Sequence, residues 1–320
     1  MRGFLEKHLA LLATGLVLVV LFSVAAGMFE NFARPLVVAN IFRNNAYLGV
    51  IAIGMTFVII SGGIDLSVGT LLGFTTIFVA KLLDAGTGAP VAIGLALLVG
   101  CVFGAGQGAL IQVYKLPPFL VTLAGMFLAK GLAFVVHLQS LSIGDEGFRA
   151  LAKVGFKIGK APVPMGTLVF VVVFLVALVV AHRTRFGRNV YAVGGSESSA
   201  VLMGLPVGRT KVGVYALSGL FAALGGVVYA MGTRSGNPAI GLGMELDAIA
   251  CAVIGGTLLT GGVGLVAGTL LGVLIYGTIN EALRFQGTLD SSWLRISMGA
   301  LLLVFIVFQR GIGKAGKLPR

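Results

Sequence analysis

Apolar stretches long enough to cross a bilayer follow one another along almost the whole chain, separated by short connections. A helix spans the hydrocarbon core of a membrane with about 20 consecutive apolar residues. We place about ten such spans, at residues 9–28, 44–61, 66–83, 89–112, 119–139, 164–182, 211–231, 247–259, 263–283 and 292–309. The sequence therefore predicts an all-α integral membrane protein with one transmembrane domain over residues 1–320.

Composition supports this fold class. Apolar residues make up 58% of the chain and charged residues 11%, with a mean hydropathy of +1.05, whereas a soluble domain carries about 25% charged residues. The glycines include Gly100, Gly104 and Gly108, whose spacing lets two membrane helices approach backbone to backbone. The N-terminus has the charged start of a secretory signal, but its apolar run, Leu9 to Met28, is near span length. We expect a retained first helix, with a cleaved signal as the alternative.

The net charge of +12 lies mainly in loops and tails, so it indicates membrane orientation and not nucleic-acid binding. Ten spans put both termini on one side. If that side is the cytoplasm, most basic residues lie inside: Arg2, Lys7, Lys115, Arg183, Arg185, Arg188, Arg209, Lys211, Arg310, Lys314, Lys317 and Arg320. The loop over residues 140–163 is an exception, since it puts four basic residues outside. Arg149, Lys153, Lys157 and Lys160 share one helical face, which predicts a helix lying on the outer membrane surface.

A segment of the chain occurs twice. SGGIDLSVGTLLGF at Ser61–Phe74 and TGGVGLVAGTLLGV at Thr260–Val273 share their glycines and the GTLLG run in register. Each copy lies where one apolar stretch ends and the next begins, an arrangement that favours a transporter built from two repeats. A chance match between two glycine-rich membrane segments is the alternative.

The turns within the two copies are the predicted moving parts. Gly62 and Gly63 in the first copy, and Gly261 and Gly262 in the second, give the backbone the freedom that a tight turn needs. Asp65 follows the first pair near the start of the next helix. A structural cap is the favoured role for its carboxylate and gating is the alternative. The second copy has Gly264 at the equivalent position, which argues against a symmetric function.

The polar stretch over residues 183–210 predicts a docking element on the cytoplasmic face. Ser196 can cap a helix and Glu197 suits its first turn, while Gly204 and Pro206 end the helix after Met203. Such a short helix is unstable alone in water. It makes sense if it docks into a groove on another protein, although an ordinary solvated loop is the alternative.

A path for a neutral, hydroxyl-rich solute needs side chains that form hydrogen bonds without strong charge. The candidates are Asn44, Asn45, Gln107 and Asn280, although such amides more often bind helices to one another. Ionisable residues within spans are few, and we note Lys130, Asp247 and Glu281 because a charge at mid-membrane costs about 3 kcal/mol.

Catalytic chemistry is not indicated. No GxxxxGK[ST] phosphate-binding loop occurs, and GFKIGK at Gly155–Lys160 lacks the spacing and the final Ser or Thr. The histidines His8, His137 and His182 lie far apart, and the two cysteines fall inside apolar runs without metal or redox spacing. We therefore expect no catalytic residues, no metal site and no cofactor.

Longer motifs connect the chain to a known family, and they cover nearly its whole length. They are GMTFVIISGGIDLSVG (Gly54–Gly69), KLPPFLVTLAGM (Lys115–Met126), AHRTRFGRNVYAVGG (Ala181–Gly195), LMGLPVGRTK (Leu202–Lys211) and ELDAIACAVIGGTLLTGGVG (Glu245–Gly264). With these motifs the chain resembles the permease subunits of bacterial ABC importers for monosaccharides, of the ribose and galactofuranose type. HRTRFG, the short loop helix and ELDAIA look most like a galactofuranose permease, while ribose, xylose and other pentose or hexose permeases share most motifs.

The resemblance implies an inner-membrane importer in which this permease pairs with itself or with a second permease. Its partners would be a cytoplasmic ATPase that hydrolyses ATP and an extracytoplasmic sugar-binding protein. The loop helix would couple the ATPase to the membrane spans, through Gly195, Ser196, Glu197, Ser198, Ser199, Leu202, Met203 and Gly204. An ion-coupled secondary carrier also uses repeats, but it needs ionisable groups in its pathway and has no use for a docking helix. A passive channel is a third possibility.

Overall fold

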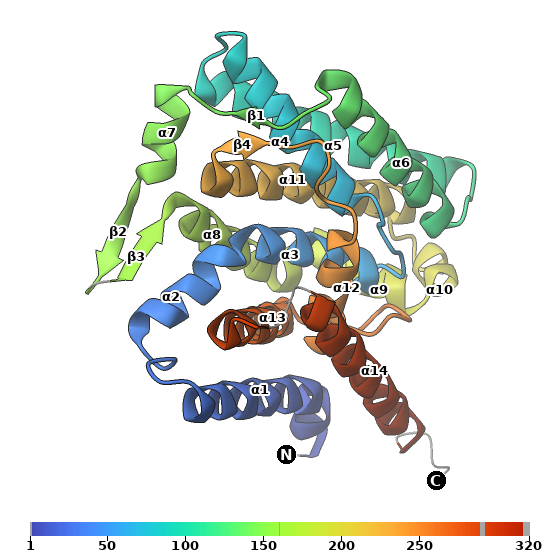
Figure 1. Ribbon diagram of the computed structural model, residues 1–320. Helices are drawn as coiled ribbons and strands as arrows, with labels where there is room; N and C mark the ends of the chain where they lie inside the picture. Colours follow the sequence, from blue (N-terminus) through green and yellow to red (C-terminus); the bar gives the residue numbers. More distant parts are fainter. Residues whose placement is uncertain (1, 160, 289–291, 316–320) are drawn as a thin grey trace.

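The computed structural model describes residues 2–159, 161–288 and 292–315 and consists mainly of helices (Figure 1). Two short antiparallel pairs complete it, in which β1 (Leu141–Ser142) pairs with β4 (Ser235–Gly236) and β2 (Gly155–Ile158) pairs with β3 (Ala161–Pro164). The helices are α1 (Arg2–Met28), α2 (Pro35–Asn44), α3 (Ala46–Ile60), α4 (Val68–Asp84), α5 (Ala89–Val113), α6 (Pro118–Val136), α7 (Glu146–Lys153), α8 (Met165–Arg183), α9 (Arg185–Gly195), α10 (Glu197–Leu202), α11 (Val207–Thr233), α12 (Met244–Ile254), α13 (Val266–Gln286) and α14 (Ser292–Ala315).

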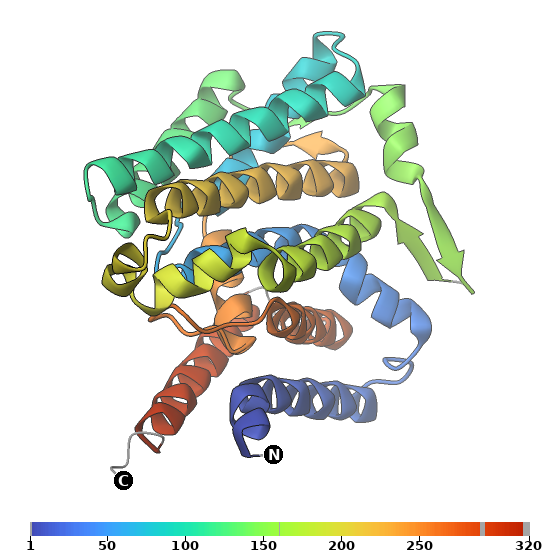
Figure 2. The ribbon, with the colours of Figure 1, turned by 180° about the vertical axis from the view of Figure 1, so that it is seen from behind.

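The long helices lie side by side, and α11 packs at their centre against α3, α4 and α5. Figure 2 shows α5, α11, α8, α13 and α1 lying one below another across the molecule. Small residues permit the closest contact, between α5 and α11. A Cβ atom at Gly104 would lie 2.1 Å from the Tyr215 carbonyl oxygen, and one at Gly219 would lie 2.2 Å from that of Gly100. The glycine spacing along α5 thus serves the close helix packing that the sequence predicts.

The number of membrane-spanning helices differs from the predicted ten. Within the described residues, six helices are long and apolar enough to cross a membrane, or up to seven if α2 and α3, which meet at a bend of 55°, form one broken span. Every predicted span coincides with a helix, but some of these helices are short. At a rise of 1.5 Å per residue, the 11 residues of α12 cover only about 16 Å of a hydrocarbon core about 30 Å thick.

Two of the short helices precede the repeated segments. α3 ends at Ile60 and leads through the glycine turn of the first copy into α4, and α12 ends at Ile254 and leads through that of the second copy into α13. The helix before each turn is buried, since Ile60 at the end of α3 and Ile254 at the end of α12 are both 0% exposed. The turns themselves are partly open, since Gly62 in the first turn and Thr260 and Val263 in the second are exposed.

The helix predicted on residues 149–160 is wrong beyond its first turns. α7 ends at Lys153 and the chain continues as strand β2, while Lys160 lies outside the described residues. Strand pairing explains the change, because a Cβ atom at Gly155 would lie 2.1 Å from the Val163 carbonyl oxygen of β3. The β2–β3 hairpin and α10 lie at opposite ends of the bundle, since α8 runs from β3 to α9 (Figure 1).

Candidate functional site

The predicted short helix on the polar stretch is present as α10, and it ends one residue earlier than expected. Ser196 caps it, because its hydroxyl oxygen accepts a hydrogen bond from the Ser199 backbone N–H at 3.3 Å. Gly204 ends it with a φ of 72°, a left-handed conformation that glycine adopts without strain. The Leu205 N–H then donates to the Ala200 carbonyl at 3.0 Å. Capping interactions between residues close in sequence thus define both ends of α10.

One side of α10 faces the protein and the other carries exposed apolar side chains. Ala200 is fully buried in a small cluster with Val193 and Val207. Val201, Leu202 and Met203 are 58%, 88% and 65% exposed. A helix of only six residues cannot hold its shape alone, so contact with α9 and α11 supports it. The exposed apolar residues are then available to a partner.

A second helix, α9, precedes α10 where the sequence predicts only a loop. Its start is fixed by Thr184, whose hydroxyl accepts from the Gly187 N–H at 3.1 Å. Gly187, Val190 and Val193 recur every three residues and are buried, which is the pattern of an amphipathic helix. α9 therefore places the glycine pair at its C-terminus, Gly194 and Gly195, against the membrane helices.

Three chain segments meet at this glycine pair, and we call their contact the glycine junction: Ile60–Gly62, Gly194–Gly195 and Gly261–Gly262. The Gly262 N–H donates to the Ile60 carbonyl at 2.8 Å, which joins the two repeat copies. A Cβ atom at Gly194 would lie 1.7 Å from the Ile60 carbonyl oxygen and 2.7 Å from the Gly262 nitrogen. No side chain fits there, so the backbones of both repeats are in direct contact with the end of α9, which leads into α10.

Further contacts attach α9 to the second repeat and α10 to α11. The Tyr191 hydroxyl of α9 donates to the Gly264 carbonyl at 2.8 Å. Lys211 of α11 pairs with Glu197 of α10 at 2.6 Å. A cavity of about 210 Å³ lies between α10 and the first turn, lined by Ser61, Gly62, Gly63, Ile111, Pro118, Val193, Gly194, Glu197, Lys211 and Tyr215. The structure thus brings the predicted turn glycines and the predicted docking helix to one end of the bundle.

Asp65 is buried at 1% exposure and is held by three hydrogen bonds. Its carboxylate accepts from the Ser67 N–H at 2.9 Å, from the Ser67 hydroxyl at 2.7 Å and from the Ser218 hydroxyl at 2.7 Å. Ser67, not Asp65, is the N-cap of the helix that follows, so Asp65 fixes the turn just before α4 instead of capping the helix. Its bond to Ser218 ties that turn to α11.

The predicted path residues contact different neighbours. Gln107, buried on α5, accepts from the Ser67 hydroxyl at 3.2 Å, beside the first repeat turn. Asn45 lies at the bend between α2 and α3, where its side-chain amide donates to the Ile41 carbonyl at 2.7 Å. Asn44 accepts from Arg43 at 3.3 Å, and Asn280 lies half-buried on α13. Gln107 thus bonds α5 to the residue that begins α4, which is the helix-binding alternative, whereas the bond of Asn45 is local.

The structure also explains an intramembrane lysine whose role the sequence leaves open. The Lys130 ammonium of α6 donates to the backbone carbonyls of Pro238 and Ala239 at 2.9 and 2.6 Å, and lies 5.3 Å from the centre of the Phe134 ring. These contacts compensate the charge within the bundle. Tyr191 was missed as a site residue, and Lys130 was noted only for its charge, because a single side chain gives no signal of its long-range partner.

Comparison with known proteins agrees with this geometry. Residues 37–306 match the model of the family described as branched-chain amino acid transport system / permease component. The chain belongs to this family. An inner membrane ABC transporter permease of Escherichia coli, YjfF, is 46% identical over 96% of this chain and 94% of its own length. The fructose import permease FruG of Bifidobacterium longum is 38% identical, covering 95% and 92% of the two chains.

The ribose import permease RbsC of Bacillus subtilis is 38% identical over 88% of this chain and 86% of its own length. No solved structure matches the chain. The chain is thus a permease subunit of an ABC transporter and not an enzyme, and ATP hydrolysis belongs to a separate subunit. Its apolar helices and its family make it a multi-pass protein of the inner membrane, and the ion-coupled carrier is excluded.

Proposed function

We propose that this permease moves a monosaccharide across the inner membrane by alternating access, driven by a partner ATPase. Relatives named as import permeases for fructose and ribose, at 38% identity over most of the chain, support a sugar as the substrate. Galactofuranose is our specific proposal, on the combination of HRTRFG, the α10 helix and ELDAIA. Ribose, xylose or another pentose or hexose is the alternative within the same family.

The observation that carries the proposal is the exposed apolar side of α10 next to the glycine junction. Leu202 is 88% exposed on a short helix that only a partner can cover. We assign α10 and its flanks, Gly195 to Gly204, as the coupling element on which the ATPase docks. Gly194 lies directly before this element and contacts both repeat copies. Movement of α10 therefore reaches both turns through backbone contacts, with no flexible side chain between them.

The remaining parts of the machine are proposed by analogy with the family. We propose one domain over residues 1–320 with both termini in the cytoplasm, on the side of α10. A second permease, identical or different, completes the pathway, and a periplasmic sugar-binding protein delivers the sugar at the opposite end. Gly62, Gly63, Gly261 and Gly262 are the proposed moving turns, and Asp65 holds the first of them to α11.

Co-purification tests the docking site. The tagged chain is purified from gently solubilised native membranes, and its companions are identified by mass spectrometry. Leu202→Asp should remove the ATPase without unfolding the permease, because truncating a central apolar anchor costs an interface about 2 kcal/mol or more. Phe156→Asp is the matched control, since Phe156 is an exposed apolar residue, 53% accessible, at the opposite end of the bundle.

Recovery of an ATPase and a second permease with the control, and loss of the ATPase alone with Leu202→Asp, would support the assignment. An ATPase that stays with Leu202→Asp would place docking elsewhere. The substrate is tested separately, by ATP-dependent uptake into proteoliposomes that contain the complete importer. Galactofuranose should be accumulated in preference to ribose and xylose, and accumulation of ribose or xylose instead would overturn the specific proposal.

A further inference from the structure

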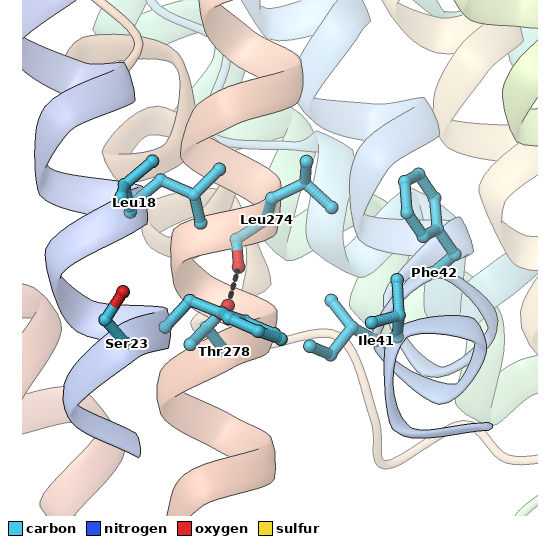
Figure 3. Close-up of a pocket in the computed structure, with 9 residues that line it drawn as sticks. Leu18, Ser23, Ile41, Phe42, Leu274 and Thr278 are labelled. Carbon is cyan, nitrogen blue, oxygen red and sulfur yellow. Dashed lines mark hydrogen bonds between the residues drawn. The ribbon is translucent and has the colours of Figure 1, made fainter. Parts of the chain in front are cut away.

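An apolar crevice separates α1 from the rest of the bundle at mid-span depth (Figure 3). Its volume is about 320 Å³, and it is lined by Leu18, Val19, Phe22, Ser23, Val38, Ile41, Phe42, Leu274 and Thr278. These residues come from α1, α2 and α13, three helices that contact one another only in part. Leu18 to Ser23 occupy the middle of the candidate span Leu11–Met28, so the crevice lies at the depth of the lipid chains.

Specific contacts attach α1 to the bundle at residues before and after those that line the crevice. Toward one end, the Thr14 hydroxyl of α1 donates to the Ile254 carbonyl at 2.7 Å. Toward the other, Phe32 packs against Phe22 and Phe285, with ring centres 5.5 and 5.3 Å apart. α1 is thus held to the second repeat above and below a gap that its own side chains leave unfilled.

Hydrogen-bond accounting excludes water as the occupant. The Thr278 hydroxyl at the floor already donates to the Leu274 carbonyl at 2.8 Å, the bond drawn in Figure 3. Ser23 is exposed and lies in α1, and every other side chain that lines the crevice is a hydrocarbon. A buried water needs two to four polar partners, which this surface does not supply. Apolar cavities stay dry or bind apolar molecules.

The outer edge of the crevice faces the bilayer. Val19 is 62% exposed and Val38 is 37% exposed, whereas Ile41 and Thr278 deeper inside are 4% and 2% exposed. At this depth the apolar molecules at hand are lipid chains. We propose that the crevice is a binding site for one acyl chain of a membrane phospholipid, held between α1, α2 and α13.

Such a chain would lie against the bend between α2 and α3. Ile41, on the crevice floor, is close to Gly277 of α13, where an added Cβ would lie 2.7 Å from its Cγ2 atom. The occupant therefore supports the contact of the bent segment with the second repeat. The inference does not depend on the identity of the sugar.

Fluorescence quenching tests the site in the assembled transporter. Trp293, the only tryptophan of the chain, is replaced by phenylalanine, and Phe42→Trp places a reporter in the crevice. The complex is reconstituted in nanodiscs with increasing fractions of phosphatidylcholine brominated on its acyl chains. Val172→Trp is the control, since Val172 on α8 is 58% exposed with no crevice around it. Leu18→Trp is a second reporter should Phe42→Trp fail to fold.

A single bound chain predicts that the Phe42→Trp signal more than halves at full bromination and falls in direct proportion to the brominated fraction. The fluorescence of Val172→Trp should fall more steeply with the brominated fraction, because several lipids surround this residue. Ser23→Phe, which adds bulk at the edge, should reduce quenching of the Phe42→Trp reporter. Equal curves for the two reporters would overturn the proposal, since they would indicate bulk lipid contact only. So would red-shifted emission, which indicates water, or quenching that appears only when the second permease is removed.

Discussion

The two copies of the repeat share a glycine pair in sequence but differ in how their turns are attached. Gly62 in the first turn and Gly261 in the second have φ values of 85° and 84°, conformations that other residues adopt only with strain. The Gly262 N–H joins the turns directly through the Ile60 carbonyl. The next glycine differs, because Gly262 also has a positive φ, of 75°, whereas its counterpart Gly63 does not. Both copies thus bring a left-handed glycine to the glycine junction, within different turns.

Beyond the junction the copies differ in what holds them. Asp65 fixes the first turn to α11 through Ser218. The second copy has Gly264 at the equivalent position, and its carbonyl accepts from Tyr191 of α9. The first turn is thus bound to the membrane core and the second to the helix that leads into α10. In the coupling that we propose, this difference would let the first turn stay fixed while the second follows the ATPase.

The largest effect is expected from disrupting the glycine junction, where the two copies meet. Gly194→Ala places a Cβ within 1.7 Å of the Ile60 carbonyl oxygen, so the backbones must separate. Overpacking of this kind costs about 1–3 kcal/mol of folding free energy or more, and transport should be lost. Gly195→Ala is the neighbouring control, because among the described residues nothing lies within 4 Å of its added Cβ. The thermal unfolding midpoints of both variants are measured in detergent. Equal midpoints would contradict the close backbone contact at Gly194.

The next effect concerns the attachment of the first copy. Asp65→Ala leaves the buried Ser67 N–H and the Ser218 hydroxyl without their acceptor. An unsatisfied buried group costs about 1–3 kcal/mol, so the thermal unfolding midpoint should fall clearly. Asp65→Asn retains an acceptor oxygen, so its unfolding midpoint should fall less. If the two variants are equally destabilised, the ionised charge and not the hydrogen bonds would account for the role of Asp65.

A smaller effect is expected at the attachment of the second copy. Tyr191→Phe removes the donor to the Gly264 carbonyl while the ring keeps its packing. The expected loss is about 1 kcal/mol of stability, together with fewer sugars moved per ATP hydrolysed. The ratio of uptake to hydrolysis in proteoliposomes checks the second part. An unchanged ratio would show that α9 does not drive the second turn.

The smallest effect is expected at the ion pair beside the first turn. Glu197→Gln removes the ion pair with Lys211. The side chain of Glu197 is 44% exposed and that of Lys211 is 17% exposed. A partly exposed pair contributes about 0–1 kcal/mol, and salt weakens it. The difference in unfolding midpoint between the variant and the native chain should therefore shrink as salt is raised. A difference that is large and independent of salt would mean that the pair is structurally more important than its exposure indicates.

Local signals in the sequence were sufficient for the fold class, the repeat and α10. Ser196 and Gly204 define the ends of α10 by capping chemistry within a few residues. The GTLLG run marks the repeat without any tertiary information. Among the described residues, α4, α12 and α14 are not candidate spans and α3 is one only together with α2, because apolar runs also form helices shorter than a full span.

Long-range contacts could not be predicted. The partner of Tyr191 is 73 residues away, and the carbonyls bound by Lys130 are more than 100 residues away. The helix expected up to Lys160 failed because pairing between Gly155 and Pro164 determines that segment, and helical spacing of lysines does not show it. The meeting of Gly194 with both turns is likewise a property of the folded chain.

Transport by Gly262→Leu tests the central claim most directly. Gly262 has a φ of 75°, and its added Cβ would lie 2.7 Å from the Gly195 Cα atom, so leucine must open the glycine junction. The variant is purified with its partners and assayed for sugar uptake in proteoliposomes. The account predicts that the ATPase stays bound, because α10 is unchanged, while uptake is lost. Uptake at the native rate would show that the junction does not transmit the movement.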